Sequence, residues 1–171
     1  MSSIHVCSLE LLAQTAEETG ARSLVTLLDT GQRVWRPKTI SPNHHICIGV
    51  SDFVDDVPGC IALPQDIHVR ELLEFVIRWD RVAPLLIHCA YGISRSTAAA
   101  FISVCALSPR RDEKEIALAL RAASPSARPN TRLIALADTI LYRSGNMNRA
   151  IEFMGPYKEC FKAKPFMLNV E

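Results

Sequence analysis

Apolar and polar residues alternate along the chain in short blocks, some with the period of a strand and others with the period of a helix. Four apolar runs are bounded by polar or turn-forming residues, a pattern typical of buried strands. These predicted strands cover residues 4–7, 23–28, 45–50 and 84–88. The last run, Pro84-Leu85-Leu86-Ile87-His88, is apolar almost throughout. Such a composition is expected of a strand that is covered on both faces of a parallel sheet.

Segments with helical periodicity lie between and after these strands. The predicted helices cover residues 9–19, the segment from Pro64 to Trp79, residues 96–107, the segment after Asp112, and residues 132–142. The run 96–107 is apolar on nearly every side, which predicts a central position in the fold. Strands that alternate with helices predict an α/β fold: one domain with a central, mostly parallel sheet flanked by helices.

The domain is expected to span residues 1–171, with a core over about 4–145. Residues 146–171 are expected to form a C-terminal extension that contains one short helix. Its last segment, KAKPFMLNVE (162–171), is predicted to lack regular structure.

Composition changes this picture little. The net charge is +1, and acidic and basic residues are interspersed, so neither a nucleic-acid partner nor a membrane partner is indicated. No apolar run approaches the 18 residues typical of a membrane-spanning helix, and the first residues do not resemble a signal peptide. We expect a cytoplasmic protein, present as a monomer or a weak dimer.

The six cysteines show no metal-binding spacing, so no metal site is expected. Cys7, Cys47 and Cys105 lie in apolar segments, where a free thiol is usually a small buried side chain. Trp35 and Trp79 are likewise expected to pack against the core.

The stretch LLIHCAYGISRST (85–97) raises a question of chemistry, because Cys89 and Arg95 stand at the spacing Cys-x5-Arg. Cys105 and Arg111 have the same spacing, so the pattern alone decides nothing. Cys89, however, ends a predicted strand and is followed by a short loop and a helix. At this position backbone N–H groups can surround an anion, and a helix N-terminus favours a thiolate.

Two further residues in this loop fit the same chemistry. Gly92 stands where a positive φ angle or a close backbone approach is needed, and Arg95 can donate two hydrogen bonds to one phosphate. By contrast, Cys105 lies inside a predicted helix, and the spacer that follows it contains Pro109 and no glycine. We therefore interpret Cys89 as a candidate nucleophile and Cys105 as a core residue.

The pattern His88-Cys89-x2-Gly92-x2-Arg95-Ser96 resembles the signature loop of cysteine-dependent protein tyrosine phosphatases, in particular the compact dual-specificity-like, bacterial-type branch. The resemblance implies phosphomonoester hydrolysis through a phosphocysteine on Cys89, with Ser96 assisting departure of the sulfur. The substrate phosphate is then held by loop residues Ala90, Tyr91, Gly92, Ile93, Ser94 and Arg95. His88 orients the loop from behind, and neither a metal nor a cofactor is needed.

The family also uses an aspartic acid that precedes the cysteine by some thirty to forty residues and protonates the leaving group. Asp52, Asp55 and Asp56 precede Cys89 by 37, 34 and 33 residues. Asp52 is preferred because it follows a predicted strand directly, and the other two stay open. Asp66 is interpreted as a first-turn residue of the next helix.

The resemblance implies a phosphatase acting on phosphotyrosine, with or without phosphoserine and phosphothreonine, and three other functions compete with it. A phosphoinositide or RNA 5′-phosphate phosphatase keeps the fold, but the loop from Ala90 to Ser94 has no basic residue. A non-catalytic phosphate-binding module leaves Cys89 and the acid candidates unexplained. A sulfur transferase of the rhodanese type leaves the Asp-rich segment 51–64 without a role.

Overall fold

The computed structural model describes residues 2–56 and 58–171, and a five-stranded sheet lies at its centre. The strands are β1 (Ser3–Ser8), β2 (Ser23–Leu28), β3 (His45–Gly49), β4 (Leu85–Cys89) and β5 (Phe166–Asn169). They are ordered β3-β2-β4-β1-β5. Strands β1 to β4 are parallel, and β5 is antiparallel to β1. The predicted α/β domain with a mostly parallel sheet is therefore confirmed.

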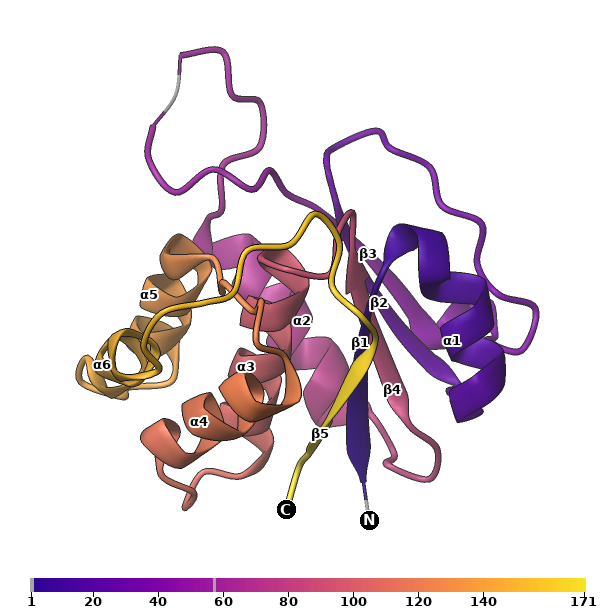
Figure 1. Cartoon of the computed structure of the whole chain (residues 1–171). Coiled ribbons are helices and arrows are strands. Elements are labelled where there is room, and N and C mark those ends of the chain that lie inside the picture. The colour runs from indigo at the N-terminus through magenta and orange to yellow at the C-terminus, as the bar shows by residue number, and fades with distance from the viewer. Residues whose placement is uncertain (1, 57) are drawn as a thin grey trace.

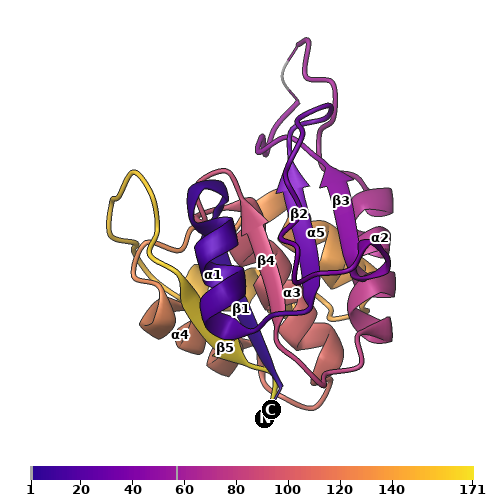
Figure 2. The ribbon, with the colours of Figure 1, turned by 90° about the vertical axis from the view of Figure 1, so that its right-hand side faces the viewer.

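Helices cover both faces of the sheet unequally (Figure 1). The described residues form α1 (Leu12–Thr19), α2 (Asp66–Arg78), α3 (Arg95–Leu107), α4 (Glu113–Ala123), α5 (Thr131–Ile140) and α6 (Asn146–Phe153), with 3₁₀ turns at Leu9–Leu11 and Pro42–His44. Figure 2 shows α1 in front of the sheet, with the other helices on the opposite side. Two separate apolar clusters result, a small one under α1 and a large one around α3.

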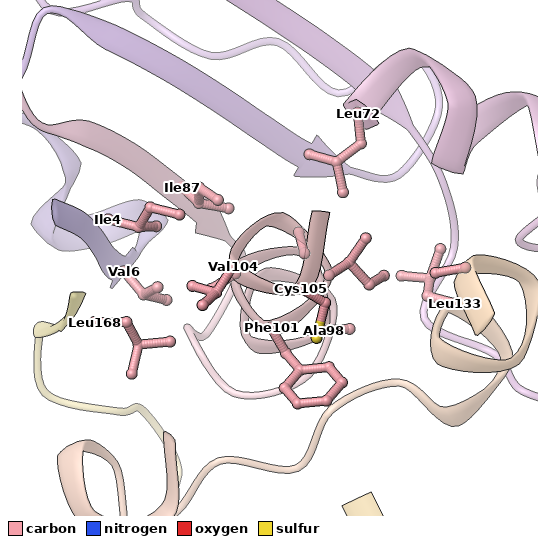
Figure 3. Close-up of a cluster of buried hydrophobic side chains, with 14 of the residues drawn as sticks. Ile4, Val6, Leu72, Ile87, Ala98, Phe101, Val104, Cys105, Leu133 and Leu168 are labelled. Atoms are coloured by element: carbon pink, nitrogen blue, oxygen red, sulfur yellow. The ribbon is translucent and has the colours of Figure 1, made fainter. Parts of the chain in front are cut away.

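Helix α3 is the centre of the large cluster. Every residue from Arg95 to Cys105 is buried, as the apolar sequence predicted. Figure 3 shows side chains of β1, β4 and β5 meeting α3 from one side, with Leu72 of α2 and Leu133 of α5 on another. Because α3 is enclosed, its first turn is held rigidly against the end of β4.

Three predictions are wrong, one about the C-terminal segment and two about the single residues Cys47 and Trp35. Residues 166–169 form β5 instead of an irregular tail, since Phe166 and Leu168 alternate with exposed residues and pack into the large cluster. Cys47 and Trp35 are exposed, whereas Cys7, Cys105 and Trp79 are buried as expected. Cys47 is exposed because β3 is an edge strand, and Trp35 is 96% exposed on the long connection between β2 and β3.

The parallel strands all end at one edge of the sheet. The loops that follow β2, β3 and β4 therefore meet there, which is where α/β proteins usually bind ligands. The connection between β3 and α2 projects above this edge in Figure 1. Its base is closed by a hydrogen bond from the Ser51 amide to the Ala62 carbonyl, 2.7 Å.

Candidate active site

A pocket of about 380 Å³ opens at this edge, beside the loop between β4 and α3. It is lined by Asp52, Val54, Cys89, Tyr91, Ile93, Ser94, Arg95, Arg128, Pro129, Asn130 and Thr131. Three segments that are distant in the sequence thus contribute to one pocket. Among the described residues, no cluster of three or more His, Cys, Asp or Glu side chains is placed to hold a metal, and no helix is long and apolar enough to cross a membrane.

The loop of residues 90–94 rests on the end of β1. Gly92 adopts a φ of +72°, and a β-carbon there would lie 3.0 Å from both the Cys7 carbonyl carbon and the Ser8 amide nitrogen. The Leu9 amide donates to the Ala90 carbonyl at 3.3 Å. Both expected reasons for glycine, a positive φ and a close backbone approach, are therefore present at this position.

The carbonyl groups of this loop bond to the surrounding scaffold. Besides Ala90, the Tyr91 carbonyl accepts from the Ala163 amide at 3.0 Å and the Ile93 carbonyl from the Arg128 amide at 2.9 Å. The Ser94 carbonyl accepts from the Ala98 amide at 3.0 Å. In a trans peptide the N–H of the next residue points opposite to the carbonyl. The amides that follow these carbonyls are thereby turned away from the scaffold, as an anion-binding loop requires.

Cys89 lies at the base of the pocket, at the last position of β4. Its Sγ atom is 3.0 Å from Ser96 Oγ, and the residue is 3% exposed. Helix α3 begins at Arg95, so the helix N-terminus faces the sulfur across a short loop. The helix N-terminus and the Ser96 hydroxyl both stabilise negative charge on this sulfur.

Arg95 is buried, and one end of its guanidinium is fixed by the protein. Nη1 donates to the Val50 carbonyl at 2.8 Å and to Asp29 Oδ1 at 3.2 Å. Nε is also buried but has no hydrogen-bond partner among the described residues. A buried donor without a partner is costly, and a bound oxyanion would satisfy it.

Asp52 lies at the rim of the same pocket. Its Oδ1 atom accepts from Ser94 Oγ at 2.6 Å and from Asn130 Nδ2 at 3.1 Å. Both hydrogen bonds go to the same carboxyl oxygen. Asp55 and Asp56 are exposed, and neither is among the described residues that line the pocket. The structure therefore brings Asp52, of the three candidates, to the cysteine.

Asn130 is a site residue that the sequence did not reveal. Its Oδ1 caps α5 by accepting from the Leu133 amide at 3.0 Å. Its Nδ2 also donates to both the carbonyl and the carboxylate of Asp52. The residue is 2% exposed, so these bonds lie within a protected junction between α5 and the rim.

His88 lies behind the loop and points away from the pocket into a polar line that crosses the sheet. Its Nε2 is 2.8 Å from Thr26 Oγ1, which is itself 2.9 Å from His45 Nε2. Burial lowers the pKa of His88 to about 4, so the imidazole is neutral near pH 7. A neutral, fixed imidazole fits a role in orienting the loop and does not require proton transfer.

The second Cys-x5-Arg match forms no site. Cys105 is fully buried inside α3, and burial raises the pKa of its thiol to about 12. Arg111 donates to the Asn169 carbonyl at 3.0 Å and so holds the end of β5. The interpretation of Cys105 as a core residue agrees with this placement.

Comparison with known proteins shows which fold this is. No family model matches the chain. No curated protein sequence matches it either. Among solved structures, the Cydia pomonella PTP-2 phosphatase is similar at a TM-score of 0.61 and 16% identity, covering 80% of this chain and 84% of that one. DUSP15 is similar at a TM-score of 0.62 and 18% identity, covering 91% and 94%.

PTPMT1 in complex with PI(5)P is similar at a TM-score of 0.59 and 10% identity, covering 86% of this chain and 94% of that one. The chain thus has the fold of the dual-specificity and protein tyrosine phosphatases, as the signature loop predicted. At these identities of 10–18% the likeness is one of fold.

Proposed function

We propose that this protein is a phosphomonoesterase of the protein tyrosine phosphatase type, acting through a phosphocysteine on Cys89. The observation that carries the proposal is the unpartnered, buried Nε of Arg95 beside a loop whose carbonyls bond to the scaffold. Arg95 and the loop residues Tyr91, Ile93 and Ser94 line the same pocket as Cys89. A tetrahedral phosphate ester supplies both the oxyanions for the donors and the electrophile for the sulfur.

In the first step the Cys89 thiolate attacks phosphorus, and the S–P bond forms as the P–O bond to the leaving alcohol breaks. Arg95 and the loop amides hold the non-bridging oxygens and offset their charge in the transition state. Protonated Asp52 gives its proton to the leaving oxygen. The hydrogen bonds from Ser94 and Asn130 hold the carboxyl group in place for this transfer.

In the second step water attacks the phosphocysteine. Asp52, now a carboxylate, accepts a proton from this water, and the S–P bond breaks to release inorganic phosphate. The Ser96 hydroxyl, 3.0 Å from the sulfur, donates to it as negative charge returns. The cycle restores the thiolate and needs only water as co-reactant.

Phosphotyrosine is the favoured substrate, because Val54, Tyr91, Ile93 and Pro129 provide apolar walls around the phosphate site. A phosphoinositide is the second candidate, since PTPMT1 of the same fold was solved with PI(5)P. Against it, the loop residues between Cys89 and Arg95 carry no basic side chain for additional phosphates.

The proposal is tested by replacing, one at a time, the two cysteines that have the Cys-x5-Arg spacing. Cys89→Ser should reduce hydrolysis of p-nitrophenyl phosphate and of a phosphotyrosine peptide below about 1% of wild type, because an alcohol stays protonated there. Vanadate binding should persist in that variant. Cys105→Ser should keep the turnover of the folded enzyme. Activity retained in Cys89→Ser, or lost specifically in Cys105→Ser, would refute the assignment.

A further inference from the structure

The segment between α6 and β5, residues 155–163, lies along one side of the pocket mouth; we name it the C-terminal strap. Figure 1 shows it running from α6 across the helices toward the carboxyl edge of the sheet before it turns down into β5. Hydrogen bonds to its backbone fix it at three points. Gly155 carbonyl accepts from Arg121 Nη2 at 3.2 Å, Lys158 amide donates to Pro125 carbonyl at 2.8 Å, and Ala163 amide donates to Tyr91 carbonyl at 3.0 Å.

The strap places aromatic rings beside two residues that line the pocket. The centre of the Tyr157 ring is 5.0 Å from the guanidinium carbon of Arg128. The Phe161 ring is 5.5 Å from the Tyr91 ring, at a tilt of 56°. Tyr157 is 38% exposed and Phe161 is 79% exposed, so neither ring serves the core. Both rings contact residues at the pocket mouth, and the Phe161 ring also lies 5.9 Å from Lys162 Nζ.

Of the two arginines that line the pocket, Arg128 is the one without a carboxylate partner among the described residues. The pocket is lined by two arginines, and Arg95 is bound to Val50 and Asp29. Arg128 has no carboxylate partner among the described residues, and it is exposed. Its backbone amide is fixed to the Ile93 carbonyl at 2.9 Å, so its side chain starts from a defined point next to the loop.

A cation over an aromatic face is held in place without being neutralised. The Tyr157 ring therefore restricts the Arg128 side chain before an anion binds, so less conformational entropy is lost on binding. The positive charge of Arg128 stays available to the anion. An anion that pairs with Arg128 would lie at the mouth, outside the phosphate site at Cys89. A carboxylate on a residue next to the phosphorylated one in a peptide meets this condition.

We propose that Arg128 selects peptides with an acidic residue beside the phosphotyrosine, and that Tyr157 of the C-terminal strap is its positioning residue. This inference rests on the proposed phosphatase function and adds the substrate class to it. The strap thereby links the C-terminal segment of the chain to substrate choice.

The test compares two phosphotyrosine peptides that differ only in having Glu or Gln on each side of the phosphotyrosine, with p-nitrophenyl phosphate as a third substrate. Wild type should hydrolyse the Glu peptide with a kcat/KM about fivefold higher, the difference lying in KM, which corresponds to one exposed charge pair. Arg128→Ala should reduce this ratio to about one. Tyr157→Leu should reduce it to about two, with turnover of p-nitrophenyl phosphate unchanged.

Two matched variants separate positioning from general effects of the strap. Phe161→Leu removes an exposed ring from the same strap, and Lys158→Ala removes an exposed positive charge from it; both should keep the wild-type Glu/Gln ratio. If Phe161→Leu lowers the ratio as much as Tyr157→Leu, the strap acts only as scaffold and the proposal is wrong. If Lys158→Ala lowers it as much as Arg128→Ala, net charge is sufficient and Arg128 has no special role.

The remaining outcomes are also decisive. A wild-type enzyme that is active but hydrolyses both peptides equally overturns this inference and leaves the phosphatase function standing. A wild type that neither turns over any substrate nor binds vanadate refutes the function and the inference together. Binding to phosphatidylserine vesicles that depends on Arg128, without a peptide preference, would assign the surface to a membrane instead.

Discussion

The Asn130 side-chain amide holds Asp52 by two hydrogen bonds, one to its carbonyl at 3.2 Å and one to its Oδ1 at 3.1 Å, although the two residues are 78 positions apart. The same side chain caps α5 through its oxygen. The start of α5 and the rim of the pocket are therefore one unit. Any movement of the α5 N-terminus would move the candidate acid relative to Cys89.

Asn130→Asp tests this coupling while it preserves the cap. Asp and Asn are about equally good N-cap residues, so the contribution of the α5 cap to the free energy of unfolding should be kept. The amide donor is lost, however, and a second carboxylate lies against Asp52. We expect kcat for a phosphotyrosine peptide to fall about tenfold or more, measured by phosphate release beside a denaturant titration. Asn130→Ala should lose activity and also about 1 kcal/mol of stability, because the cap is removed. A normal kcat in Asn130→Asp would show that the contact between Asn130 and Asp52 has no role.

The leaving group distinguishes Asp52 from its neighbours. A phenol such as tyrosine, with a pKa near 10, needs a proton on departure, whereas an activated aryl ester needs little help. Asp52→Asn should therefore lower kcat on phosphotyrosine by about 10²-fold and much less on the activated ester. Asp55→Asn and Asp56→Asn serve as controls and should behave as wild type on both substrates. If one of the controls shows the leaving-group dependence instead, the acid is not Asp52.

The parts of the site that depend on local sequence were predictable. The loop from Cys89 to Arg95 is contiguous, and Gly92 could be placed because a positive φ is a local requirement of so short a loop. Its close approach, by contrast, is to Cys7 and Ser8 of β1. Asp52 was preferred because parallel strands end at one edge, so a residue after β3 comes close to a residue after β4. The Asn130 contact and the Asp29 partner of Arg95 involve segments 78 and 66 positions apart, and no short pattern encodes such distances.

The same distinction explains the errors in the fold. The segment Phe166–Asn169 has only four residues, and its partner β1 is at the other end of the chain. Alternation of apolar and polar residues over only four positions is weak evidence for a strand. It becomes convincing only when β1 is known to have a free edge with which this segment can pair. Trp35 was expected to pack because it is large and apolar, but packing depends on where the long connection between β2 and β3 lies.

Gly92→Ala should disturb the loop more than the same change at a glycine with open space. A β-carbon at Gly92 meets backbone atoms at 3.0 Å, whereas at Gly31, with a φ of +85°, it meets nothing within 4 Å. Gly31→Ala should therefore cost only the left-handed backbone strain, about 1 kcal/mol, and keep full activity. Gly92→Ala should cost about 2–3 kcal/mol and lower kcat about 10²-fold, because the loop must shift away from β1. Equal costs in the two unfolding titrations would mean that β1 does not hold the loop.

The buried His88 imidazole should make the fold sensitive to moderate acid. Its pKa is lowered to about 4 by burial, whereas an unfolded histidine titrates near 6.5. Between these two values the unfolded chain binds a proton that the folded protein does not, so stability is highest above about pH 6.5 and falls as the pH decreases toward 4. The loss approaches about 1.4 kcal/mol per pH unit, roughly 3 kcal/mol in all.

Burial also lowers the pKa values of His5, His45 and His68, which act in the same direction. Comparison of wild type with His88→Gln in denaturant titrations from pH 7 to 4.5 isolates the contribution of His88, because the other histidines are common to both. The variant should show the shallower dependence, and parallel curves would mean that His88 is not held neutral by the fold.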